Sequence, residues 1–443
     1  MAHGQLCCVL RDDPATGTVA CPFGVMCRAT GSCQFYHPPC IVQQATTKRK
    51  TSVAGDASRD TPSPLLGKLP EIEEGVARKM IPTERTVMLH MVSRTVQAAM
   101  DTVILTARIQ IKRNQPLDDK LAAQIHEMQW CRIADLDLSK VAIGAEGAAR
   151  MAAVLQQCPL LARLDLAGNS IGAQGMGRLA PALARCPLLA YLDLRGNSIG
   201  DGGAGRLAGV LGQCSSLHHL NLYGNAIGAA GAGRLAAALV QCHWLVSVDL
   251  GCNSIGAEGA GLLAAALGGC RSLTNLNLYG NLIRDAGMQQ LAAVLGGCQA
   301  LARLDIGSND IGAEGAGYLA AVLGRCRSLA AIDLCCNAIG SEGVGLLSAG
   351  LVQSSSLARL DLHGNSLGDS GVARLATALV RCPALSYLNL RRNAIGAEGV
   401  GQLAGVLGLC TSLTCMNLLG NAIGAEGAEQ LRAAAPREID LRL

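Results

Sequence analysis

The sequence predicts an α/β solenoid built from copies of one short strand and one helix. Each copy contains an alternating apolar segment of strand type, followed by a segment with the apolar spacing of a helix. A unit of this length cannot bury both apolar faces alone, whereas stacked copies can. The copies are marked by asparagines spaced 28 residues apart, namely Asn169, Asn197, Asn225, Asn253, Asn281, Asn309, Asn337, Asn365, Asn393 and Asn421.

The unit around Asn169 illustrates both elements. Leu164 and Leu166 alternate with Asp165, which predicts a strand with inward leucines and an outward carboxylate. Leu179 and Leu183 are four residues apart with small residues between them, which predicts one apolar helix face. Because the chain has only 2 Phe, 2 Trp and 6 Tyr among 443 residues, leucine and small side chains must fill the core.

This phrase, LxxLxLxxNxI followed by a helix, resembles the leucine-rich-repeat family, in particular the ribonuclease-inhibitor-like units that also occur in NOD-like receptors. The resemblance covers residues 131–443. It implies a right-handed horseshoe with a parallel sheet on the concave side and helices on the convex side. It also implies that each asparagine amide bonds the backbone of adjoining turns. The function that it implies is the binding of another protein on outward strand positions.

The two ends of the solenoid are expected to differ from its middle. The first unit carries Val141 where the other units carry asparagine. Before it, residues 76–130 have helical apolar spacing and predict a helical segment, one helix running from Thr83 to about Arg113, and an N-terminal cap. At the carboxyl end, Ile439 and Leu441 match inward strand positions, which places Asp440 in the outward column of Asp165.

Cysteine also recurs once per unit near the return from helix to strand. A disulfide framework would not use a column that serine interrupts, so we expect buried, reduced thiols that behave as small apolar side chains. The column consists of Cys158, Cys186, Cys214, Cys242, Cys270, Cys298, Cys326, Cys382 and Cys410, with Ser354 in the remaining place.

Outward strand positions are the candidate binding surface. Four of the 6 tyrosines fall there although packing does not require them, and tyrosine and arginine are enriched at binding hot spots. The outward aspartates are interpreted as a ladder of solvated charges that neighbouring arginines neutralise. The predicted protein contacts are Tyr191, Arg195, Tyr223, Tyr279, Arg303, Arg359, Tyr387 and Arg391.

Residues 1–40 form a cysteine-rich segment with metal-ligand character. Cys21, Cys27, Cys33 and His37 are separated by five, five and three residues, a spacing that permits a tetrahedral zinc site. The segment resembles a CCCH zinc finger, although its first gap is shorter than usual in that family. Other ligand sets that include Cys7, Cys8 or Cys40 stay open, as does a cysteine-rich tail without metal. The resemblance implies RNA as a partner, and hence an alternative function as an RNA-binding post-transcriptional regulator.

The remaining features narrow the class of protein. Residues 41–75 are polar and Pro-bearing, which predicts a disordered linker, and residues 48–50 (KRK) are a minimal candidate for nuclear import. The sequence has no visible signal peptide and no apolar stretch of transmembrane length, so a cytoplasmic protein without membrane contact is expected, with the nucleus as an alternative. A net charge of +4 predicts no general attraction to polyanions. Walker A and GxSxG motifs are absent, so we expect neither nucleotide binding nor enzyme activity.

Overall fold

The computed structural model describes residues 18–20, 26–28, 108–110 and 134–443. The chain divides into two units, Met1–Glu71 and Ile72–Leu443. The described part of the first unit is the antiparallel pair β1 (Thr18–Ala20) and β2 (Met26–Arg28), in which Val19 lies opposite Cys27. Residues 41–75 and the candidate ligands Cys21, Cys33 and His37 lie outside the described residues.

From residue 134 onward, the second unit alternates one short strand with one helix. The strands and helices are β4 (Asp135–Asp137), α4 (Gly144–Leu155), β5 (Arg163–Asp165), α5 (Gly172–Leu183), β6 (Tyr191–Asp193), α6 (Gly200–Leu211), β7 (His219–Asn221), α7 (Ala229–Leu239), β8 (Ser247–Asp249), α8 (Gly256–Leu267), β9 (Asn275–Asn277), α9 (Arg284–Leu295), β10 (Arg303–Asp305), α10 (Ala313–Leu323), β11 (Ala331–Asp333), α11 (Gly340–Gln353), β12 (Arg359–Asp361), α12 (Gly368–Leu379), β13 (Tyr387–Asn389), α13 (Ala397–Leu407), β14 (Cys415–Asn417), α14 (Gly424–Ala434) and β15 (Asp440–Arg442).

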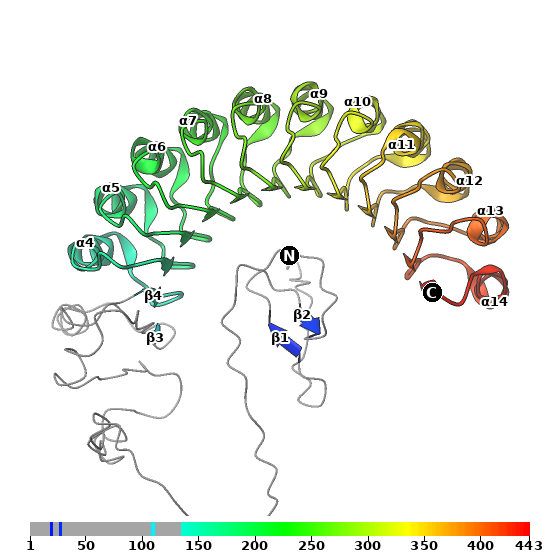
Figure 1. Cartoon of the computed structure of the whole chain (residues 1–443), viewed down its shortest axis with the longest axis horizontal. Coiled ribbons are helices and arrows are strands. Elements are labelled where there is room, and N and C mark those ends of the chain that lie inside the picture. The colour runs from blue at the N-terminus through cyan, green and yellow to red at the C-terminus, as the bar shows by residue number, and fades with distance from the viewer. Residues whose placement is uncertain (1–17, 21–25, 29–107, 111–133) are drawn as a thin grey trace, which may run out of the picture. The chain divides into compact units, whose positions relative to one another are not determined.

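The strands of this unit form one parallel sheet in strict chain order. Neighbouring strands pair in register, so that Leu164 of β5 lies beside Leu192 of β6. Figure 1 shows helices α4–α14 along the outer side of an arc and the strands along its inner side. The core lies between these two layers, where leucines such as Leu164, Leu179 and Leu207 are fully buried. The predicted solenoid is thereby confirmed.

The sheet begins earlier than the sequence analysis predicts. Strand β3 (Arg108–Gln110) pairs in parallel with β4, with Ile109 beside Leu136. The expected helix between Thr83 and about Arg113 is therefore wrong at these three residues. A physical reason is that β4 would otherwise present an unpaired edge, which an added strand satisfies. The rest of the predicted helical cap lies outside the described residues.

The sheet also ends in a register that differs from the predicted one. Asp440 of β15 lies beside Cys415 of β14, and Arg442 lies beside Asn417. These partners are 25 residues apart instead of 28, because the chain returns from α14 to the sheet over a shorter path. Arg442, and not Asp440, therefore occupies the outward column of Asp165.

The asparagine ladder acts as the resemblance implies. The side-chain nitrogen of Asn281 donates to the carbonyl oxygens of Leu250, at 2.9 Å, and Leu278, at 3.0 Å. Its side-chain oxygen accepts from the backbone N–H of Ile255 at 3.3 Å. One buried amide thus links the turns of adjacent repeats, which satisfies backbone groups that water cannot reach.

The cysteine column is confirmed as a set of free thiols, and most of its members are buried. Each thiol tends to donate to the carbonyl four residues earlier, as Cys326 does to Val322 at 3.3 Å. Burial raises the pKa of Cys158 to about 11 and of Cys186 to about 12. These thiols therefore stay protonated and unreactive at neutral pH.

Candidate functional site

Each strand places three columns of side chains on the inner face of the arc. The first column holds the residues in register with Arg163, the central column those in register with Asp165, and the third column the residues two positions beyond the central one, such as Arg195. The predicted tyrosines and arginines divide between the first and third columns, on either side of the acidic central column. Tyr191, Arg303, Arg359 and Tyr387 belong to the first column.

The central column is structural and not a ladder of solvated charges. Asp193 is only 1% exposed, and its Oδ1 accepts the backbone N–H of Arg195 at 3.0 Å. Asn277 makes the same bond to the backbone N–H of Tyr279 at 2.8 Å. Aspartate and asparagine are interchangeable here because both offer an oxygen to the backbone as it turns away from the strand. The interpretation of the aspartates as solvated is therefore wrong for Asp165 and Asp193, which are buried.

Burial changes the acidity of this column. It raises the pKa of Asp193 to about 6. It also raises the pKa of Asp305 to about 7, with the neighbouring carboxylate of Asp333 as the second cause. Strands β10, β11 and β12 each carry an aspartate at this position, so that like charges adjoin across the sheet. The column contributes less negative charge near neutral pH than its composition indicates.

Tyr191 lies at the centre of a cluster that the strands β5, β6 and β7 assemble. The guanidinium carbon of Arg163 lies 3.8 Å from the centroid of the Tyr191 ring, and the ring of His219 lies 6.1 Å away. The Tyr191 hydroxyl donates to Asp193 Oδ2 at 3.4 Å. Arg195 Nε lies 3.5 Å from the same oxygen. The tyrosine is therefore held in place before any partner arrives, while the side chain of Arg195 remains 55% exposed.

Tyr387 repeats this arrangement near the carboxyl end of the sheet. The guanidinium carbon of Arg359 lies 3.9 Å from the centroid of its ring. The backbone N–H of Arg391, on the same side as Tyr387, donates to Asn389 Oδ1 at 3.1 Å. Arg163 and Arg359 thus take equivalent positions, one repeat before a tyrosine. Arg163 is absent from the sequence-based contacts, and only its register with Tyr191 identifies it.

Tyr223 and Tyr279 are held in a different way, over glycine. A Cβ added to Gly251 would lie 2.8 Å from a ring carbon of Tyr223, and one added to Gly307 would lie 3.0 Å from a ring carbon of Tyr279. Each ring therefore rests on the backbone of the next repeat, in space that any larger side chain would fill. Tyr223 is 37% exposed, and its hydroxyl accepts a hydrogen bond from the thiol of Cys252.

The structure brings the predicted contacts together in part. Tyr191 and Arg195 share Asp193, and Tyr387 contacts Arg359. Arg303 is exposed on β10 and has no ring partner among the described residues. The surface is a series of separate aromatic and cationic points along the sheet, not one continuous patch.

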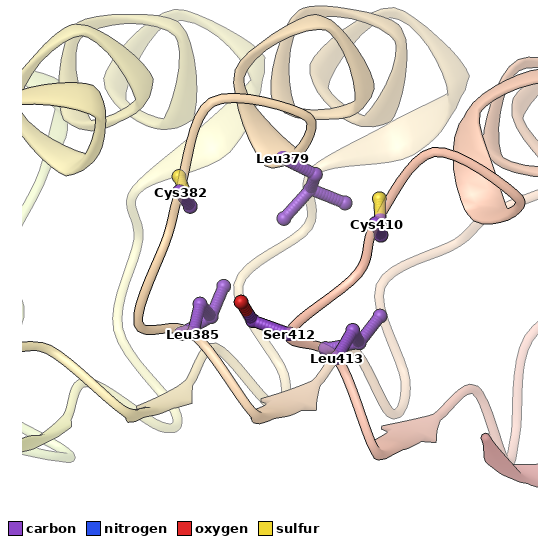
Figure 2. Close-up of a pocket in the computed structure, with 6 residues that line it drawn as sticks. All are labelled: Leu379, Cys382, Leu385, Cys410, Ser412 and Leu413. Carbon is purple, nitrogen blue, oxygen red and sulfur yellow. The ribbon is translucent and has the colours of Figure 1, made fainter. Parts of the chain in front are cut away.

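No enclosed site for a small ligand accompanies this surface in the described residues. Figure 2 shows a cavity between two repeats, lined by Leu379, Cys382, Leu385, Cys410, Ser412 and Leu413. It offers about 10 Å³, the room for about one water molecule. Among residues 134–443 and the three short strands before them, no group of His, Cys, Asp and Glu side chains could hold a metal ion. No described helix has the length and apolarity needed to cross a membrane.

A comparison with known families decides the identity of the repeats. The family profile described as "Leucine Rich repeat" matches residues 157–180, 185–208, 213–236, 241–264, 297–320, 353–376, 381–404 and 409–431. The chain is a leucine-rich-repeat protein. The segments of this leucine-rich-repeat protein between the matched ones carry the same strand and helix in the same register.

Comparison with curated proteins gives no match. Among solved structures, the leucine-rich-repeat chain is similar to leiomodin-1 actin-binding site 2, with 17% identity, a TM-score of 0.25, and coverage of 28% of this chain and 70% of that chain. It is also similar to an internalin, inlF, from Listeria monocytogenes str. 4b F2365, with 17% identity, a TM-score of 0.36, and coverage of 68% of this chain and 94% of that chain.

Proposed function

We propose that this leucine-rich-repeat protein is a noncatalytic scaffold that binds another protein across its inner, concave face. The observation that supports this most strongly is the way the tyrosines are held. Tyr191 and Tyr387 stack against arginine, and Tyr223 and Tyr279 lie over glycine. Rings that are already fixed lose little conformational entropy on binding, which favours affinity. Exposed arginines beside them offer directed hydrogen bonds to a partner.

The test replaces the four tyrosines with alanine and measures capture of partner proteins by crosslinking in cell extract. We expect the quadruple variant to lose partners that the unmodified chain retains. Tyr318→Ala is the matched control, because Tyr318 lies on helix α10 and not on the sheet. Retention of the same partners by the quadruple variant, with an unchanged circular dichroism spectrum, would exclude the tyrosines as contacts.

We also propose a reducing intracellular setting for this scaffold. The cysteines of residues 134–443 are all free, including the exposed Cys336. Free thiols in such number persist in the cytosol or nucleus and become oxidised outside it. Imaging of a tagged chain distinguishes the cytoplasm from the nucleus, and Lys48→Ala with Arg49→Ala tests the candidate import segment.

A second candidate function is RNA binding through a zinc site of Cys21, Cys27, Cys33 and His37. The observation that favours it is the pairing of β1 with β2, which places the strand that ends just before Cys21 alongside the strand that contains Cys27. Metal analysis of the reduced full chain should then find about one zinc per molecule. Cys27→Ser with His37→Ala should remove that zinc and any crosslinking to RNA, while leaving capture on the concave face intact.

A further inference from the structure

Four arginines occupy equivalent positions on consecutive helices α4, α5, α6 and α7. All four side chains are exposed on the outer face of the arc, and we name Arg150, Arg178, Arg206 and Arg234 the arginine row. The same position on the next four helices holds Leu262, Gln290, Tyr318 and Leu346, and cationic character returns only at Arg374. Positive charge is therefore continuous over the first four helices alone.

The side chains of the arginine row are laid across the preceding helix. A Cβ added to Gly177 would lie 2.9 Å from Nη1 of Arg206, and one added to Gly205 would lie 2.8 Å from Cδ of Arg234. Arg234 Nη1 also donates to the carbonyl oxygen of Asp201 at 3.2 Å. The glycines leave the space that lets each arginine extend over its neighbour, so the guanidinium groups are held at fixed places.

Local acids neutralise this row only in part. Arg178 Nη1 lies 2.8 Å from Glu146 Oε1, an exposed pair that shows how the row accepts a carboxylate. The carboxylate of Asp201 instead accepts the backbone N–H groups of Gly228 and Gly231. Within the described part of the chain, Arg206 forms no ion pair, which leaves cationic groups directed at solvent.

We infer that the arginine row binds an acidic helical segment of a partner protein. Packed helices lie about 8–10 Å apart, so successive arginines recur at about that distance. A helix that carries a carboxylate every seventh residue presents charges about 10.5 Å apart, which matches this spacing. Arginine also pairs with carboxylates in a directed, bidentate manner that lysine does not offer.

The surface is less suited to nucleic acid. Residues 131–443 contain a single lysine, Lys140, and the helices α4–α7 carry no aromatic side chain on which a base would stack. Carboxylates are also interspersed with the row, as Glu146 shows, and these would repel a continuous line of phosphates.

The test uses the full chain and a fluorescent, alanine-rich helical peptide with glutamate at every seventh position. We expect binding that weakens with added salt and that the matching glutamine peptide does not show. Arg178→Glu with Arg206→Glu and Arg234→Glu should weaken binding at least about tenfold, since three exposed pairs are reversed. Arg374→Glu is the matched control, because Arg374 has the same anchor on a preceding carbonyl, that of Ser341 at 3.4 Å, but no arginine neighbour in its column.

Several outcomes would overturn the inference. These are equal affinity for the glutamate and glutamine peptides, an equal loss with Arg374→Glu, or tighter binding of the row to single-stranded oligouridine or to anionic lipid vesicles. The milder triple change of the same three arginines to glutamine separates loss of charge from misfolding. The quadruple tyrosine variant should still bind the acidic peptide, because the two surfaces lie on opposite layers of the solenoid.

Discussion

Asp201 caps the helix of the following repeat: its Oδ1 accepts the backbone N–H of Gly228 at 2.7 Å and that of Gly231 at 2.9 Å. These groups belong to the start of α7, where Gly228 takes an extended conformation and supplies no side-chain cap. Asp285 and Asp369 make the equivalent bond to the repeats that follow them. The three aspartates are 84 residues apart, so this device recurs every third repeat.

Removal of this cap should destabilise the repeats locally. Asp201→Ala is expected to lower the free energy of unfolding by about 1 kcal/mol, the usual cost of losing an N-cap. Hydrogen exchange should increase mainly in α7, since each repeat contacts only its neighbours. Glu258→Ala is the control, because Glu258 occupies the first turn of α8 without a cap bond. Similar losses in both variants would show that the cap contributes nothing specific.

The asparagine ladder makes a sharper prediction at Asn281. Replacement with leucine leaves buried backbone groups unpaired, at about 1–3 kcal/mol for each one. Asn275→Leu makes the same change in the same repeat at an outward position, where the described residues give its side chain no hydrogen bond, and should cost less than about 0.5 kcal/mol. Denaturant unfolding monitored by hydrogen exchange compares the two variants. Equal effects would contradict the structural role of the ladder.

The acidic column predicts a dependence of stability on pH. Because the folded pKa of Asp305, about 7, lies above its ordinary value of 3.8, the folded chain keeps a proton that the unfolded chain releases. The free energy of unfolding should therefore fall as the pH rises from about 4 to about 7.

Asp305→Asn should reduce that fall and stabilise the chain at pH 8 by about 1–3 kcal/mol. Asparagine already accepts the equivalent turn bond at Asn277, so the backbone should not change. Asp310→Asn, at an exposed position, serves as the control for the loss of one carboxylate. Thermal unfolding between pH 4 and pH 8 measures the difference, and parallel curves for all three proteins would refute the prediction.

The thiols should separate into two classes by reactivity. Cys336 is exposed and should react with iodoacetamide in the folded chain. Cys186 is 1% exposed, with a pKa raised to about 12, and should react only after unfolding. Mass spectrometry of the alkylated peptides over time distinguishes the two. Early modification of Cys186 would show that the column opens readily.

The repeat itself could be predicted because its signal is local and occurs many times. The alternation around Leu164, the four-residue spacing of Leu179 and Leu183, and the recurrence of asparagine each depend on a few adjacent positions. Outward placement of the tyrosines followed from the same alternation, because a strand of known register determines which side chains leave the core.

Only the tertiary structure decided which of these side chains meet. The stacking of Arg163 on Tyr191 and the bond from Gly228 to Asp201 join residues about one repeat apart, and they depend on how closely neighbouring units pack. The length of the return from α14 placed Arg442, and not Asp440, in the central column. Burial of Asp193 depends on side chains from both adjoining strands, so a sequence pattern that identifies an outward aspartate cannot determine whether water reaches it.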